Sequence, residues 1–259
     1  MSAYVLLGIK AYRRNLQYRA AHMVNNAASA IFGFIYMAIW QAAAAGESDG
    51  PYSAAIMAQW VAFNQVMVWL AVFLPFGLGI PEMVRTGAVS LEMLRPLDFH
   101  LMVVLRELGT LCYNALFRSL PLALVFASVI GVRVPEKLAT YPLLAVAVLL
   151  AAYIGLCQQY LVGISAFWTI QARWAWQLLN TFQIVLSGFM VPIELLPAPF
   201  SQLARALPFA PLHHDPTRIY LELAGAEALA WPVAWAILLT FVCRYLTAKA
   251  RRKLEVQGG

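Results

Sequence analysis

The sequence has 259 residues, of which 62% are hydrophobic and only 12% are charged, and its formal net charge is +6. A soluble domain carries about 25% charged residues and roughly 45–50% apolar ones, because its surface must be covered with polar groups. The composition therefore excludes an ordinary soluble domain. In lipid the backbone must satisfy its own polar groups, so long apolar runs rich in Ala and Leu predict membrane-spanning helices rather than barrel strands.

Six stretches are long and apolar enough to cross a bilayer, for which a helix needs about 20 residues. They predict an all-α integral membrane protein with one transmembrane domain over residues 1–259. Pro75 and Gly77 are expected to bend the end of the second span. The expected spans cover residues of about 22–45, 54–80, 108–130, 142–167, 174–191 and 229–246.

Three segments outside these spans carry further information. At helical spacing, residues 4–19 have an apolar face, which includes Val5 and Ile9, and a basic face, which includes Lys10. This pattern predicts an amphipathic helix at the inner membrane interface. Residues 81–107 form a charged segment between the second and third spans. Residues 192–228 form a long, proline-rich and moderately apolar segment between the fifth and sixth spans.

The distribution of Lys and Arg predicts the orientation of the chain, because cytoplasmic loops carry an excess of these residues. Most of the 18 Lys and Arg residues fall on the same side as the N-terminus. Six spans therefore place both termini in the cytoplasm. The cations expected outside are Arg133, Lys137, Arg205 and Arg218.

Motifs for catalysis are absent from the sequence. It contains no GxxxxGK[ST] nucleotide loop, no HExxH, no CxxC and no GxSxG. We therefore expect no enzymatic activity, no cofactor and no metal in this chain, and no nucleic-acid partner. The three cysteines lie in apolar stretches without metal-ligand spacing and are interpreted as small core residues: Cys112, Cys157 and Cys243.

The only cluster of histidines is His213-His214, which Asp215 follows directly. One interpretation is a metal or proton site at the outer face. The simpler interpretation is a loop-to-helix junction, in which Asp215 caps a helix with Pro216 in its first turn. We favour the simpler interpretation.

Ionisable groups inside a membrane are costly and therefore mark functional candidates. Glu107, Asn114 and Arg118 are spaced by seven and four residues, which places them on one face of the third span. In the functional interpretation this polar stripe faces a translocation path or a partner helix. In the structural one it forms an interhelical salt bridge, or Arg118 extends along its own helix toward the interface. Both interpretations stay open from the sequence alone.

Two segments resemble a known family. Residues 85–97, RTGAVSLEMLRPL, are similar to the R-x-G-x(6)-L-R-P-L segment of ABC-2 type permeases. Residues 186–197, LSGFMVPIELLP, resemble the pattern that follows the fifth span of that family. The chain looks closest to the subfamily with a separate ATPase and often two different permeases, although His213 and His214 replace residues that are usually aromatic or apolar there.

This resemblance implies the permease subunit of an ATP-driven exporter in the bacterial plasma (inner) membrane, with alternating access or lateral extrusion as its mechanism. It implies three kinds of partner: a cytosolic ABC ATPase that holds ATP and Mg²⁺, a second permease (the same chain or a paralogue) and membrane lipids. The segment between spans two and three becomes the coupling helix. The coupling residues are Glu82, Arg85, Gly87, Glu92, Arg95 and Pro96.

The resemblance also implies short re-entrant helices between spans five and six that close an outer gate. Pro192 and Glu194 lie at the start of this segment, and together with Glu107, Asn114 and Arg118 they are the candidate residues of the path or gate. Two other functions remain open, an ion-coupled secondary carrier and a membrane scaffold that transports nothing.

Overall fold

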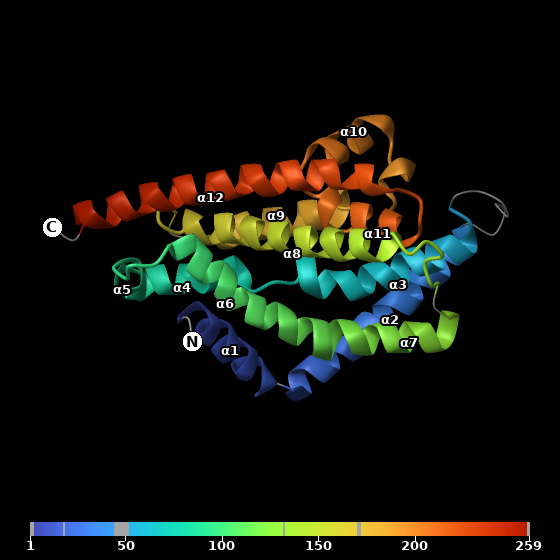
Figure 1. Ribbon diagram of the computed structural model, residues 1–259, viewed down its shortest axis with the longest axis horizontal. Coiled ribbons are helices and arrows are strands. Elements are labelled where there is room, and N and C mark those ends of the chain that lie inside the picture. The colour runs from blue at the N-terminus through green and yellow to red at the C-terminus, as the bar shows by residue number, and fades with distance from the viewer. Residues whose placement is uncertain (1–2, 18, 44–51, 132, 170–171, 258–259) are drawn as a thin grey trace.

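The computed structural model describes residues 3–17, 19–43, 52–131, 133–169 and 172–257, and it contains helices but no strand within these ranges. The α-helices are α1 (Ala3–Leu16), α2 (Arg19–Ala43), α3 (Ala54–Ala71), α4 (Ile80–Arg85), α5 (Ala88–Met93), α6 (Phe99–Asn114), α7 (Leu120–Ile130), α8 (Thr140–Ser165), α9 (Arg173–Leu186), α10 (Ala198–Ala206), α11 (His214–Tyr220) and α12 (Ala230–Gln257). The long helices run along the longest axis of the molecule (Figure 1). The prediction of an all-α fold is confirmed.

Five helical stretches among the described residues are long and apolar enough to cross a membrane. They are His22–Ala43, Ala54–Arg85, Phe99–Ile130, Thr140–Ser165 and Ala226–Leu254. The expected fifth span is different, because its helix α9 has only 14 residues. At 1.5 Å per residue α9 measures about 21 Å, which is less than the roughly 30 Å hydrocarbon core. Six full spans therefore remain a prediction.

The chain nevertheless returns along part of the molecule through α9. Both ends of the chain lie at the end that carries α4 and α5, whereas α10 and α11 lie toward the opposite end (Figure 1). Helix α9 lies beside α8 and leads the chain from the α4–α5 end back toward α10. The irregular residues 187–192 follow α9 and extend this return.

The second span is interrupted rather than merely bent. Helix α3 ends at Ala71, and a 3-10 turn, Phe76–Gly79, separates it from α4. Gly77 and Leu78 both have positive φ, 49° and 51°. Pro75 precedes this turn and Gly77 permits its left-handed backbone, so the sequence correctly located the break.

The third span begins earlier than expected, at Phe99 instead of near residue 108. Asp98 caps the helix by accepting a hydrogen bond from the Leu101 amide at 2.9 Å. The charges that suggested a loop are paired inside the structure, because Arg106 lies 3.0 Å from Glu107. Arg106 also donates to the backbone oxygen of Leu78 at 2.5 Å. A span can hold this pair because both charges are compensated.

Helix α8 is the central helix, and it packs against α3, α11 and α12. Two glycines of α8 permit close backbone approaches. A Cβ atom on Gly155 would lie 2.0 Å from the Ala71 oxygen, and one on Gly163 would lie 2.2 Å from the Gly77 oxygen. Small residues at helix contacts allow such packing in membranes, where van der Waals contact is a main driving force.

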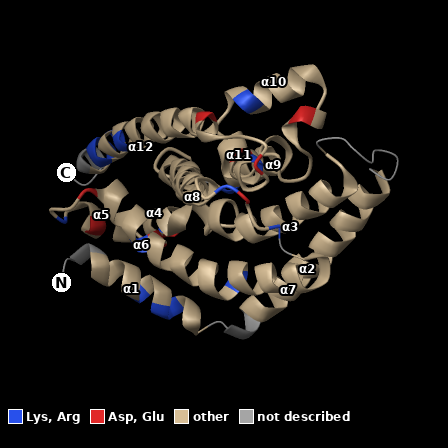
Figure 2. Cartoon of the chain, turned by 45° about the vertical axis from the view of Figure 1, so that its right-hand side comes forward, with Lys and Arg blue, Asp and Glu red and all other residues tan. Residues whose placement is uncertain are grey.

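Helices at the two ends of the sequence extend the core at the α4–α5 end. The predicted amphipathic segment forms α1, which packs along α6 where the backbones of Gly8 and Gly109 meet. Helix α12 is longer than the predicted sixth span, because the basic residues from Lys249 continue the helix instead of forming a separate tail. Lys and Arg gather on α1 and on the C-terminal part of α12 (Figure 2).

Candidate functional site

The candidate coupling element is the helical hairpin α4–α5, which lies at the same end as both termini (Figure 1). Gly87 caps α5 with φ 74°, so the turn between the helices requires the left-handed conformation that glycine adopts easily. Pro96 follows α5 in the linker to α6. Val89 and Met93 bury one side of α5, and Leu91 and Leu94 are exposed on the other. The hairpin thus presents an outer surface with both apolar and charged side chains.

The charged residues of the hairpin and its linker form two ion pairs, and within each pair the two residues lie one helical turn apart. Arg85 lies 2.6 Å from Glu82, and Arg95 lies 3.1 Å from Glu92. Surface pairs of this kind contribute little to stability. The effect of these ion pairs is therefore to hold the charged side chains in a fixed pattern on an exposed surface.

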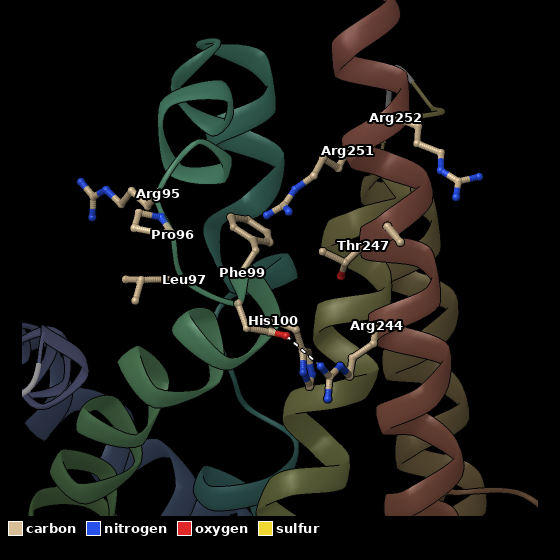
Figure 3. Close-up of a pocket in the computed structure, with 11 residues that line it drawn as sticks. Arg95, Pro96, Leu97, Phe99, His100, Arg244, Thr247, Arg251 and Arg252 are labelled. Carbon is tan, nitrogen blue, oxygen red and sulfur yellow. Dashed lines mark ion pairs between the residues drawn. The ribbon is translucent and has the colours of Figure 1, made fainter.

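A cavity of about 720 Å³ lies between the linker that follows α5 and helix α12 (Figure 3). Arg244 and Arg251 point from α12 into this cavity (Figure 3), and Arg251 donates to the backbone oxygen of Met93 at 3.3 Å. Asp98 forms an ion pair with Arg244 at 3.3 Å and neutralises part of the charge. The cavity is lined by Arg95, Pro96, Leu97, Asp98, Phe99, His100, Arg244, Thr247, Ala248, Arg251 and Arg252.

A second cavity, of about 750 Å³, lies between α4 and the residues that follow α8 and begin α9. Glu82 and Arg85 line it from α4, and Arg173 lines it from the start of α9. The hairpin and its linker to α6 therefore border two cavities that carry charged side chains. The predicted coupling residues all lie on the hairpin or on its linker to α6: Glu82, Arg85, Gly87, Glu92, Arg95 and Pro96.

The structure places only part of the predicted polar stripe together. Asn114 donates to the backbone oxygen of Trp69 at 2.9 Å, and the Arg118 guanidinium lies 4.0 Å from the centre of the Trp69 ring. Arg118 also contacts His22, and the helix is a π-helix at this point, Ala115–Ser119. Glu107 pairs with Arg106 instead. Asn114 and Arg118 thus attach α6–α7 to α3, which favours the interhelical interpretation of the stripe.

Glu194 is the centre of a charged cluster in the segment after α9. Its Oε1 atom lies 3.2 Å from Nε2 of His214, 3.4 Å from Arg205 and 3.6 Å from Arg218. Burial alone would raise the pKa of Glu194, but the contacts with His214 outweigh it and hold the pKa at about 2. Pro192 ends the irregular turn just before Glu194. The cluster joins α10 to α11.

The two adjacent histidines point to different neighbours. His214 contacts Glu194, whereas the fully buried His213 packs its ring 5.0 Å from the Phe189 ring. Asp215 lies in the first turn of α11, but His213 is the capping residue and makes no side-chain capping bond, so the predicted role of Asp215 as the cap was wrong. The divergent side chains do not form one metal site.

The His213→Phe variant is expected to become more stable relative to wild type as the pH falls. Burial lowers the pKa of His213 to about 3, so the native protein binds fewer protons than the unfolded chain between pH 6.5 and 3. Wild-type stability therefore falls with pH across this window, and about 1.4 kcal/mol is lost at one unit below the unfolded pKa. Melting temperatures at pH 7.5 and 5.5 measure whether the difference between variant and wild type widens.

The Asp215→Asn variant is expected to show the opposite dependence of stability on pH. Burial raises the pKa of Asp215 to about 6, so its favourable contribution is present below pH 3.8 and is lost as the pH rises through 6. This variant should be more stable than wild type at pH 7.5 and lose part of that advantage at pH 5.5. A pH response in the same direction for both variants would contradict one of the two assignments, and opposite signs to those expected would contradict both.

One cluster was missed in the sequence. His100, Cys157 and Cys243 are all buried, and one potential ligand atom from each lies within 4.8 Å of the others. They come from α6, α8 and α12 and are far apart in the chain, so no local spacing of residues could predict the cluster. Two of them were expected to be ordinary core residues. Only the packing of three helices brings them together.

These features define a multi-pass helical membrane protein with a charged hairpin at the end that carries both termini. Residues 34–258 match the family described as ABC-2 family transporter protein. The chain belongs to this family of transporter membrane components. Searches of curated proteins and of solved structures returned no match.

Proposed function

We propose that this chain is the permease subunit of an exporter that is driven by ATP hydrolysis on a separate cytosolic ATPase. The observation that carries the proposal is the exposed hairpin α4–α5 in a chain of the ABC-2 family. A coupling element must transmit motion to the spans. The hairpin does so through α4, which continues the interrupted second span, and through the Asp98 cap, which begins the third.

The ATPase docks on the hairpin and on the two cavities beside it. Arg251 and Arg244 give one cavity a basic wall, so acidic side chains of the ATPase are the complementary groups. ATP and Mg²⁺ bind to that partner. This orientation places the hairpin and both termini in the cytoplasm and the chain in the bacterial inner membrane, in agreement with the excess of Lys and Arg at that end.

A second permease, the same chain or a paralogue, completes the transporter. The exposed side of α9 is suited to this contact, because Trp174, Leu178 and Phe182 form an apolar stripe at helical spacing. The outer helices α10 and α11, joined through Glu194, then form the re-entrant gate between the two halves. Packing of α11 against α3 and α8 connects this gate to the spans.

Co-purification of the native complex tests the proposal. The chain carries a tag, the membrane is extracted in mild detergent, and mass spectrometry identifies the co-purifying chains. We expect a soluble chain with a nucleotide-binding loop in stoichiometric amount, together with a permease of the same family. A stable preparation of this chain alone would contradict the proposal and favour the ion-coupled carrier.

A further inference from the structure

Three buried side chains meet where α6, α8 and α12 converge, below the basic cavity of Figure 3. His100 lies in the first turn of α6 and lines the floor of that cavity (Figure 3). Cys157 and Cys243 lie behind it on α8 and α12, and both are fully buried. All three potential ligand atoms lie within 4.8 Å of one another. We propose that His100, Cys157 and Cys243 bind a soft or borderline transition-metal ion of the Zn²⁺ class.

The hydrogen bonding of the cluster points to a missing ligand. Buried polar atoms in proteins almost always have partners. His100 is only 5% exposed, yet its Nε2 atom has no hydrogen-bond partner that meets ordinary geometry among the described residues. The Cys243 thiol donates a long hydrogen bond to the backbone oxygen of Cys157 at 3.7 Å, and the Cys157 side chain interacts with those of Cys243 and His100. An ion between the three groups would satisfy Nε2 of His100 and replace the weak contacts of the thiols.

The donor atoms select the chemical class of the ion. Two thiolates and one imidazole suit Zn²⁺ and related ions, whereas Mg²⁺ and Ca²⁺ require oxygen ligands. Zn²⁺ bound to two thiolates has no net charge, which suits a buried site because uncompensated charge is costly there. Binding releases the two thiol protons, since the thiolate is the ligand. The fourth coordination position is left for water or an exchangeable ligand.

The position of the cluster gives it a structural consequence. The ion would join α12 to α6 and α8 directly beside the linker that follows α5. The cavity lined by Asp98, His100 and Arg244 supplies the route to the site. Occupancy would therefore hold α12 against the element that we propose to dock on the ATPase.

Metal titration of the purified chain tests this inference. Wild-type protein in detergent is reduced with a phosphine, stripped with a chelator and titrated with Zn²⁺ against a chromogenic competitor. We expect about one tightly bound ion per chain. Co²⁺ replaces Zn²⁺ in a parallel sample, and a thiolate-to-Co²⁺ charge-transfer band is expected in the near ultraviolet.

Cysteine variants locate the ion. Cys157→Ser and Cys243→Ser preserve side-chain size and should each weaken Zn²⁺ binding by at least about 100-fold, since even outer-shell partners are worth about 10–100-fold. Cys112→Ser is the matched control, because this exposed thiol lies outside the cluster and its loss should change nothing. Equal affinity in all three variants would overturn the site.

The Co²⁺ spectrum of the wild type needs no variant, so the test survives a folding failure in either serine variant. Absence of the thiolate band in reduced wild-type protein would overturn the proposal. A Cys157–Cys243 disulfide that persists in the reductant, without bound metal, would do the same.

Discussion

Gly163→Ala is expected to destabilise the protein strongly, although helix propensity predicts the reverse. Alanine in a helix interior is favoured over glycine by about 1 kcal/mol. At Gly163, however, the new Cβ would lie 2.2 Å from the Gly77 oxygen and 2.9 Å from Cδ1 of Ile80. The first of these atoms belongs to the backbone of the left-handed turn and cannot rotate away. We expect a loss of roughly 3 kcal/mol or more, at the upper end of overpacking.

The measurement is the melting temperature and the yield of monodisperse protein in detergent. Gly8→Ala is the matched control, because Gly8 is also helical but its nearest neighbour would lie 3.3 Å from the new Cβ. The control should stay within about 1 kcal/mol of wild type. A stabilised Gly163→Ala protein would show that the turn at Gly77 does not contact α8 as described.

Arg85→Glu is expected to lower coupled transport and permease-stimulated ATP hydrolysis by about tenfold or more, while the protein inserts and melts normally. Arg85 is exposed and, among the described residues, forms an ion pair with Glu82 one turn away, so its loss removes little from the fold. On the proposed docking surface, reversing this charge instead places like charges against each other across the interface with the ATPase. Transport into inverted vesicles and ATPase assays of the reconstituted complex measure the effect.

The double variant Glu82→Arg, Arg85→Glu separates docking from local helix stability. It restores an ion pair within α4 but exchanges the positions of the charges. Activity should remain low if the hairpin acts through its charge pattern toward the partner. Recovery of activity in the double variant would show that the pair serves α4 alone. Lys137→Glu, exposed at the opposite end of the molecule, is the control and should behave as wild type.

The sequence predicted most of the helices because lipid imposes a simple rule on them. Apolar runs located α2, α3, α8 and α12, and Pro75 with Gly77 located the break in the second span. The predicted helix boundaries were wrong where charged residues were interpreted as a solvent-exposed loop or tail. Arg106 and Glu107 neutralise each other, so a helix runs through both of them. The basic residues from Lys249 likewise continue α12.

The candidate sites also differ in how far the sequence could predict them. The predicted coupling residues fall within residues 82–96, so one short segment of sequence places all of them on the hairpin or its linker. The polar stripe depended on helix spacing alone, which placed Asn114 and Arg118 correctly but could not show that Trp69 would meet both. The cluster of His100, Cys157 and Cys243 depends on three helices packing together. Nothing in the local sequence encodes such a meeting.

The shortness of α9 has a consequence for the lipid around the protein. Helix α8, with 26 residues, measures about 39 Å, whereas its neighbour α9 measures about 21 Å. Where no second permease covers α9, a bilayer beside this pair meets two helix lengths at once, and it adjusts by local thinning at a cost of fractions of a kcal/mol per Å. The protein therefore has an uneven hydrophobic belt, thinnest along α9. Acyl-chain length becomes a variable that acts on one side of the molecule and leaves the other nearly unaffected.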